Sequence, residues 1–392
     1  MKKNVSLALF LAFLILLTMI LSGCKKTPDV TATNTAQVEA TAEAAVAELE
    51  NASADAQTAA PAPQPESLHA ELEKNLTIDA KVTAPTDANA SIPTIRVQEL
   101  TADPEKVRDL VFPNSVIETD YSHYSNTPDY TSWHLDGDRN VTTSKGSINA
   151  STPFGDAVTQ LYAVEWILND ESLTRPDLNF ASREAVIQQV LNLFSEIGLK
   201  HVQCDAIYAL TADQLQSASD HMAIDFAAEI QDGRAAYKEK WTADDECYVL
   251  NLQITMGEYG LPIFSDDTIK SFAFTELHYD NCELEAVVSK NGVESLRVSR
   301  AVQEVEQGAV DPILNAEKLP DLISGYYQNI IVERPTTITE IALNYVMFPV
   351  NSGTAYELKP VWCCHAITRY EADDEIESKW IVFDARSGQI YY

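Results

Sequence analysis

The alternation of apolar and polar positions divides the chain into an apolar start, a polar tract and a long patterned region. Residues 5–21 are almost all apolar, whereas residues 25–74 are rich in Ala, Thr, Glu, Asn and Pro and contain no Phe, Trp or Tyr. A tract of that composition cannot bury enough apolar surface to offset the entropy lost on ordering, so we expect a disordered linker. Strand-like alternation over residues 76–82 predicts that folded structure begins near Leu76.

Helical signals gather in the first half of the patterned region. Residues 151–168 carry apolar side chains at helical spacing. Ser182 is a good N-cap for a second helix, and Gly198 stands where the left-handed residue that ends such a helix is expected. Thr211, followed at helical spacing by Gln214, gives the pattern of a capping box that opens a third helix. These segments predict three helices before residue 240.

Strand signals dominate the second half. Asn291-Gly292 is the strongest turn signal, because this dipeptide favours the type I′ geometry that closes hairpins. The predicted strands are residues 247–256, 271–279, 282–289, 293–300, 338–347, 356–370 and 380–385, with a short helix near 320–328. Because helices and strands cluster instead of alternating, we predict an α+β fold of antiparallel sheets packed with helices. We expect an N-terminal α+β subdomain over residues 76–240 and a mainly antiparallel β subdomain over residues 241–392.

The apolar start is framed by two short motifs. Lys2 and Lys3 precede it, and Leu21-Ser22-Gly23-Cys24 follows it. This arrangement resembles the lipobox of bacterial lipoproteins. The resemblance implies that residues 1–23 are a signal peptide, that Cys24 carries acyl chains, and that residues 24–75 link this anchor to a domain on the extracytoplasmic side of a membrane. An uncleaved membrane anchor is the competing interpretation.

The charge balance limits the kinds of partner. The formal net charge is −32, and removal of two lysines with the signal peptide gives −32 − 2 = −34. So acidic a surface repels phosphate backbones and anionic lipid headgroups, which argues against a nucleic-acid partner. No nucleophile elbow, zinc-protease motif, phosphate loop or dinucleotide fingerprint is present. We therefore predict no catalytic residues, metal or cofactor.

Five cysteines remain once Cys24 is assigned to lipid, so at least one has no partner within the chain. Cys247 and Cys282 could face each other across an antiparallel strand pair and form a disulfide, or both could be reduced. Cys363 and Cys364 are adjacent on a predicted strand and should point to opposite faces. Neighbours on a strand cannot easily converge on one ion, so buried structural cysteines are favoured there over a metal site.

Aromatic and histidine side chains gather in one short segment, which is the candidate recognition surface. Exposed aromatic rings can anchor a partner or stack on a sugar. The alternative is a loop whose aromatic rings cover the core. The residues are Tyr121, His123, Tyr124, Tyr130, Trp133 and His134.

The end of the chain carries a further resemblance. Leu358-Lys359-Pro360-Val361-Trp362, a polar hairpin and the stretch from Trp380 to Ile390 resemble the end of PepSY-like and YycI-type domains over about the last 100 residues. In such an ending Asp384 caps a turn, Gly388 takes a positive φ and Ile390 returns to the sheet. The resemblance implies a cell-envelope protein that regulates a membrane partner, and it carries no catalytic residues over to this chain.

These observations favour an extracytoplasmic, membrane-anchored lipoprotein that acts as a non-enzymatic binding or regulatory module for an envelope or membrane protein. A lipid-anchored hydrolase of cell wall or polysaccharide is the first alternative. A solute-binding lipoprotein is the second, and it is disfavoured because its lobes need alternating βα units with parallel sheets, whereas the second half reads as antiparallel.

Overall fold

The computed structural model describes residues 63–85, 91–127, 129–162, 167–264, 284–350, 355–370 and 376–391. Residues 61–392 form one compact unit. The predicted signal peptide, Cys24 and most of the expected linker lie outside the described residues, as does the strand expected at residues 271–279. In the part of the chain that is described, no helix has the length and apolar character needed to cross a membrane.

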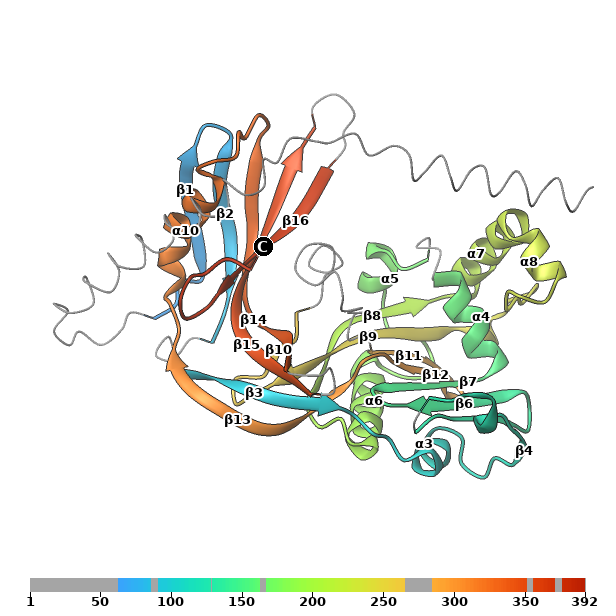
Figure 1. Cartoon of the computed structure of the whole chain (residues 1–392). Helices are drawn as coiled ribbons and strands as arrows, with labels where there is room; N and C mark the ends of the chain where they lie inside the picture. The colour runs from blue at the N-terminus through green and yellow to red at the C-terminus, as the bar shows by residue number, and fades with distance from the viewer. Residues whose placement is uncertain are drawn as a thin grey trace, which may run out of the picture. The chain divides into compact units, whose positions relative to one another are not determined.

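The first sheet joins the two ends of the described chain (Figure 1). Its strands follow the order β1-β2-β14-β15-β3-β13, and β16 also pairs with β15. The pairings are antiparallel except that of β2 with β14. The strands are β1 (Ser67–Glu73), β2 (Leu76–Thr83), β3 (Ser91–Glu99), β13 (Val302–Pro312), β14 (Thr336–Val350), β15 (Ala355–Arg369) and β16 (Ile376–Asp384).

The second sheet is built from the middle of the chain and is antiparallel throughout its described pairings. Its order is β10-β9-β11-β12-β7-β6-β5-β4, with β8 also paired to β9, so β4 forms one edge. The strands are β4 (Ile117–Asp120), β5 (Thr131–Leu135), β6 (Arg139–Ser144), β7 (Ser147–Ser151), β8 (Val202–Leu210), β9 (Cys247–Met256), β10 (Leu261–Pro262), β11 (Leu284–Ser289) and β12 (Gly292–Val298).

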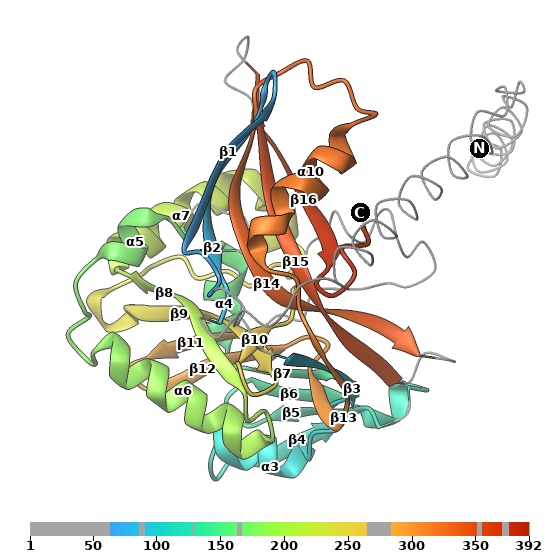
Figure 2. The ribbon, with the colours of Figure 1, turned by 90° about the vertical axis from the view of Figure 1, so that its left-hand side faces the viewer.

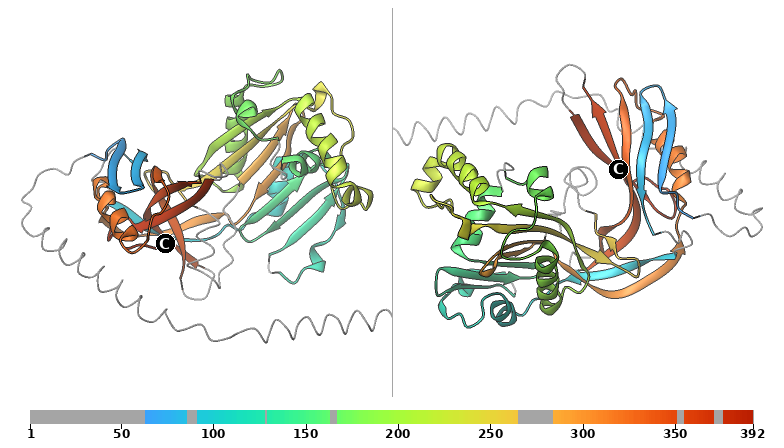
Figure 3. Two further views of the ribbon diagram at one scale, coloured as in Figure 1. Left: turned by 90° about the horizontal axis from the view of Figure 1, so that it is seen from above. Right: turned by 180° about the vertical axis from the view of Figure 1, so that it is seen from behind.

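Helices cover both faces of the second sheet. α3 (Pro104–Val111) and α6 (Arg183–Ile197) pack on the face that carries Leu250, and Figure 2 shows α6 lying across the strands. α4 (Pro153–Tyr162) and α7 (Ala212–Asp225) pack on the face that carries Val249. The view from behind in Figure 3 shows α7 and α6 on opposite sides of this sheet. Because alternate residues of β9 point to opposite faces, one strand serves both cores. α10 (Leu319–Tyr327) lies against the first sheet (Figure 2).

Shorter helical elements connect these layers. They are α5 (Asp170–Thr174), α8 (Ala227–Gln231) and the 3-10 turns η1 (Ser122–Tyr124), η2 (Ala243–Asp245) and η3 (Ala316–Lys318).

The expected mixture of helices with mostly antiparallel sheets is present, and strands account for more of the described chain than helices. The caps are also as predicted: Ser182 accepts a hydrogen bond at the start of α6, Gly198 ends that helix with a φ of 120°, and Thr211 closes a capping box with Gln214. Such caps follow from residues a few positions apart, which explains why the sequence reveals them.

Several boundaries differ from those expected. β1 lies within the segment that was expected to be linker. It forms a strand because its apolar side chains alternate with polar ones and because it pairs with β2. The third predicted helix is divided into α7 and α8, since Phe226 between them leaves helical geometry with φ −118° and ψ 27°. The expected subdomain boundary at residue 240 falls between β8 and β9, which are hydrogen-bonded neighbours in one sheet.

The hairpin at Asn291-Gly292 forms, but its turn is not of the predicted type I′. Gly292 has a φ of 115°, whereas Lys290 and Asn291 are not among the described residues with positive φ. The register then shifts so that Glu294 is left opposite no residue of β11. Its buried carboxylate accepts hydrogen bonds from Ser289 Oγ (2.5 Å) and Thr152 Oγ1 (2.7 Å), so the bulge is fixed by polar contacts instead of turn geometry.

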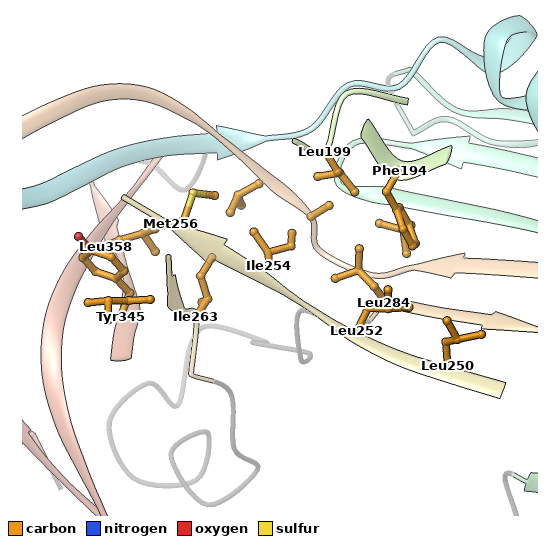
Figure 4. Close-up of a cluster of buried hydrophobic side chains, with 14 of the residues drawn as sticks. Phe194, Leu199, Leu250, Leu252, Ile254, Met256, Ile263, Leu284, Tyr345 and Leu358 are labelled. Carbon is orange, nitrogen blue, oxygen red and sulfur yellow. The ribbon is translucent and has the colours of Figure 1, made fainter. Parts of the chain in front are cut away.

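A group of buried side chains joins the end of β9 to the first sheet, and we call Met256, Ile263, Tyr345 and Leu358 the junction cluster (Figure 4). Tyr345 Oη donates to the carbonyl oxygen of Pro93 at 3.0 Å, and the amide of Phe264 donates to the Tyr345 carbonyl at 2.7 Å. This cluster ties the two sheets together near β10.

A second tie forms where the chain passes between the sheets. The amide of Leu100, after β3, donates to the carbonyl of Ala301, before β13, at 2.8 Å. The amide of Gly146 donates to Leu100, and the amide of Ala301 donates to Gly146. A Cβ at Gly146 would come within 3.4 Å of the Ala301 oxygen. This tie fixes the start of the segment that leads through α3 to β4.

Candidate functional site

β4 is a four-residue edge strand whose ends are held by side-chain hydrogen bonds. At its start, the amide of Val116 donates to Asp136 Oδ1 at 2.8 Å, and the amide of Asp136 donates back to the Val116 carbonyl at 3.0 Å. Just past its end, the amide of Tyr121 donates to the Ser132 carbonyl at 2.8 Å. The strand is thus positioned although all of its side chains are exposed.

Asp136 is the anchor at the first end. Its carboxylate also accepts a hydrogen bond from Arg139 Nη2 at 2.6 Å, and the Arg139 guanidinium lies 5.5 Å from the centre of the Phe112 ring. The hydrogen bond from the Val116 amide, assisted by the charge of Arg139, holds the pKa of Asp136 below its ordinary value. The ionised carboxylate is therefore the form that holds β4 in place.

Asp120 has the same role at the second end. Its carboxylate accepts the amide of Ser122 at 2.8 Å, and Ser122 Oγ accepts the amide of Ser132 at 3.0 Å. Hydrogen bonding from Ser122 holds the pKa of Asp120 below its ordinary value. This short network places the 3-10 turn η1 directly after β4.

η1 carries a cluster of exposed aromatic rings. The His123 and Tyr124 ring centres are 4.1 Å apart, and those of Tyr121 and Tyr124 are 6.0 Å apart. Tyr124 is 77% exposed and Tyr121 is 44% exposed. Solvent-exposed rings in mutual contact offer a preformed apolar surface to a partner.

The structure divides the six residues of the predicted recognition surface into two groups. Tyr121, His123 and Tyr124 lie together on the surface. Trp133 does not join them: its side chain is buried on β5, with the Arg108 guanidinium 5.7 Å from its ring centre. For Trp133 the interpretation as a core-covering ring is the correct one.

Tyr130 and His134 are partly buried. His134 Nδ1 lies 3.1 Å from Asn140 Oδ1, and its Nε2 lies 3.6 Å from Asp138 and 3.9 Å from Glu118. His134 therefore supports β4 from the neighbouring strand and is not part of the aromatic cluster.

Two apolar residues just before the aromatic cluster are exposed as well, and they were not part of the predicted surface. Val116 is 62% exposed, and Ile117 is the first residue of β4 and also exposed. Together with the tyrosines they form a segment, residues 116–124, in which every residue except Ser122 is exposed, and we call it the aromatic edge. Isolated exposed apolar residues are ordinary, but a run of them at a sheet edge marks an interaction site or an aggregation hazard. In the sequence, this exposed segment could have been recognised from two apolar residues that are followed by charged residues and a Tyr-rich stretch.

The described cysteines lie apart from any candidate metal site. Cys363 and Cys364 are both buried and belong to different hydrophobic clusters, which confirms that they point to opposite faces. Burial, with a neighbouring carboxylate at Asp205, raises the pKa of Cys204 to about 11. Within the described residues, no group of three or more metal-ligating side chains is positioned to hold an ion.

Cys282 lies outside the described residues, so its predicted disulfide with Cys247 stays a prediction. In the described strands, β9 and β11 place Cys247 opposite Ser289 and Leu252 opposite Leu284.

The C-terminal turn has the geometry expected from the sequence. Asp384 Oδ1 accepts the amides of Arg386 (3.0 Å) and Ser387 (2.8 Å), Gly388 has a φ of 72°, and Ile390 bridges back to Phe383. Tyr391 Oη donates to Asp384 Oδ2 at 2.6 Å. Burial acts to raise the pKa of Asp384, but these hydrogen bonds outweigh it and hold the pKa below its ordinary value. The turn closes the sheet and is structural.

Comparison with known proteins gives a fold and no function. No family model and no curated protein matches the chain. Among solved structures, the crystal structure of an uncharacterized protein from Eubacterium rectale is similar, with a TM-score of 0.58 and 15% sequence identity over 84% of this chain and 94% of that chain. At this identity the likeness shows the fold alone.

Proposed function

We propose that the chain is an extracytoplasmic lipoprotein, anchored through Cys24, whose folded domain is a non-enzymatic binding or regulatory module for an envelope or membrane protein. The observation that carries this proposal is the aromatic edge. Exposed rings and apolar side chains gather there on an edge strand that is fixed at both ends, which is the arrangement a protein partner can use.

The two resemblances in the sequence support the location. The lipobox-like Leu21-Ser22-Gly23-Cys24 would place the domain outside the cytoplasm, and the PepSY-like and YycI-type ending is compatible with regulation of a membrane partner. The formed turn at Asp384 agrees with that ending.

The carboxyl groups favour binding over hydrolysis. A glycosidase needs a carboxylic acid whose pKa is raised so that it can donate a proton. Each described carboxyl group with a clear shift has its pKa lowered by hydrogen bonding or a neighbouring cation: Asp120, Asp136, Asp245 and Asp384. The antiparallel pairing of the second sheet likewise gives no support to a solute-binding lobe.

The proposal is tested by photo-crosslinking from the aromatic edge in intact cells that produce the chain. A photoreactive phenylalanine replaces Tyr124, and the matched control replaces Ile224 on α7, because both side chains are 77% exposed. We expect a specific crosslinked envelope or membrane protein from position 124 and not from position 224. Equal products from both positions, or none from position 124, would overturn the proposed surface.

The anchor is tested separately by Cys24→Ala. We expect the wild-type chain to incorporate a labelled fatty acid and to fractionate with membranes, and the variant to lose both properties. A variant that still incorporates the label would show that Cys24 is not the lipidated residue.

A further inference from the structure

The outer side of β4 has no strand against it within the described part of the sheet, since β4 ends the order of the second sheet. Natural proteins commonly protect such an edge with bulges, charges or covering elements. β4 has a register irregularity between Ile117 and Thr119 and carries charges, yet it also exposes apolar side chains. Because hydrogen bonds hold both of its ends, its backbone is already in the geometry that an added strand needs.

The charge around this edge is mostly negative, although Lys145 Nζ lies 3.5 Å from Asp129. Residues 116–140 contain five acidic side chains and one arginine, a formal charge of 1 − 5 = −4 with histidine neutral. Arg139 is paired with Asp136, so it does not offset the other carboxylates. Glu118 and Asp120 on β4, and Asp138 in the adjacent turn, leave the edge strongly negative.

The aromatic rings add a second preference. An Arg or Lys placed over the face of an exposed aromatic ring gains about 0.5–1 kcal/mol from the cation–π interaction. Tyr124 is 77% exposed, and its ring is in contact with those of His123 and Tyr121. Rings beside carboxylates on a strand edge therefore favour a basic, extended ligand.

From these observations we infer that the aromatic edge takes a basic, extended segment of a partner protein, which adds to β4 as a strand and places lysine or arginine side chains against Glu118, Asp120 and Tyr124. The inference rests on the proposed function and names the occupant of its surface. A second copy of this chain is a poor occupant, because two edges of charge −4 repel each other.

The test uses the full-length chain in detergent and three synthetic peptides of equal length. The first alternates Lys with Thr and Val, the second replaces each Lys by Glu, and the third has the Lys sequence with a central Pro that cannot donate to a ladder. We expect the Lys peptide to bind, the Pro peptide to bind more weakly, and the Glu peptide not to bind. Affinity should fall as ionic strength rises from about 0.01 M to about 1 M, where the Debye length shrinks from about 30 Å to about 3 Å.

Two variants locate the contact. Glu118→Lys should lower the affinity for the Lys peptide about tenfold, because it replaces an attraction with a repulsion. Tyr124→Ala should lower this affinity roughly two- to fivefold, which corresponds to the loss of one exposed cation–π pair. The matched control is Glu306→Lys, which reverses an exposed carboxylate on β13, the edge strand of the other sheet, and should leave the affinity unchanged.

Hydrogen exchange distinguishes strand addition from looser binding. The Lys peptide should protect backbone amides of residues 117–120, and the same segment should stay unprotected with the Glu peptide. Equal binding of the Lys and Glu peptides, or binding without protection of β4, would overturn the inference.

The crosslinking experiment separates this inference from the proposed function. If position 124 captures a specific partner through a segment that is not basic, or captures a glycan, the inference of a basic strand is wrong. The aromatic edge would then still be a binding surface. If position 124 captures nothing, the proposed function itself fails.

Discussion

The junction cluster and the aromatic edge both depend on tyrosine but use it in opposite ways. Tyr345 is buried, its hydroxyl donates to Pro93, and burial raises the pKa of that hydroxyl. Tyr124 is mostly exposed and its described contacts are with the neighbouring rings. Tyr345 joins two sheets, whereas Tyr124 contributes to no hydrophobic core.

This difference teaches how to read aromatic residues in a sheet protein. A buried ring whose polar atom has a partner is part of the structure, and Tyr248 is a second example: its hydroxyl accepts the amide of Leu178 and donates to the carbonyl of Ala181. A ring that is exposed on an edge strand held in place by hydrogen bonds lowers solubility and adds no packing in the core. Recognition is the simplest reason for it.

Removal of Tyr345 should have the largest effect on stability. Tyr345→Ala removes a buried aromatic side chain and is expected to lower the free energy of unfolding by about 3–5 kcal/mol. Tyr345→Phe keeps the ring and leaves the Pro93 carbonyl without its donor, so we expect about 1–3 kcal/mol. Denaturant unfolding of both variants measures the difference. Equal losses for Phe and Ala would mean that the hydroxyl, and not the packed ring, joins the sheets.

Asp384→Ala is the next largest expected change. It removes the acceptor for the amides of Arg386 and Ser387 and for the Tyr391 hydroxyl, so we expect a loss of about 1–3 kcal/mol. Ser387→Ala is the matched control, because it keeps the carboxylate and both amide contacts and should cost less. A loss no larger than that of the control would show that the turn does not depend on Asp384.

The turn at Asp384 also shows which parts of the structure can be predicted from the sequence. The turn at Asp384 and the caps at Ser182 and Thr211 follow from residues within a few positions of each other, and the structure has them as expected. The parallel pairing of β2 with β14 joins residues more than 250 positions apart, and no local pattern encodes it. β1 is a separate case, because it pairs with the adjacent β2 through a tight turn, so the alternation of its apolar residues was a local signal.

The sequence predicts only part of the aromatic edge, because burial and position in a sheet depend on residues that are far apart along the chain. Residue type indicated aromatic recognition, but the burial of Trp133 depends on Arg108 of α3, which packs on one face of the sheet. That β4 is an edge strand depends on the order of the whole sheet. The sequence therefore predicts that rings gather near residues 121–134, and the sheet topology decides which of them remain exposed.

Acidification should loosen the aromatic edge by a smaller, local amount. The pKa values of Asp120 and Asp136 are lowered in the folded chain by hydrogen bonds to Ser122 and Val116. A carboxyl with a lowered folded pKa stabilises the fold above its unfolded pKa of about 3.9, and this contribution is lost as the pH falls through the folded value. Amide protection of residues 116–122, measured by hydrogen exchange against an unfolded reference, should hold from pH 7 to about 5 and fall below about 4.

Asp136→Asn gives the control for this pH dependence. The variant should already show weaker protection of Val116 at pH 7 and a smaller further loss on acidification, because one of the two titrating anchors is gone. Loss of protection between pH 7 and 6 in the unaltered chain would contradict the assignment of the anchors to Asp120 and Asp136.

The smallest effect on stability should come from Tyr124→Ala, and its smallness is the informative result. An exposed side chain outside the core changes the free energy of unfolding by no more than about 0.5 kcal/mol, and Ile224→Ala, at the same 77% exposure, should behave alike. Only Tyr124→Ala should reduce capture of a partner at the aromatic edge, which a pulldown with both variants compares directly. If Tyr124→Ala instead destabilised the chain by more than about 1 kcal/mol, the rings of η1 would be covering the core after all. Tyr124 would then belong with Tyr345 among the structural tyrosines, and the contrast between the two regions would be lost.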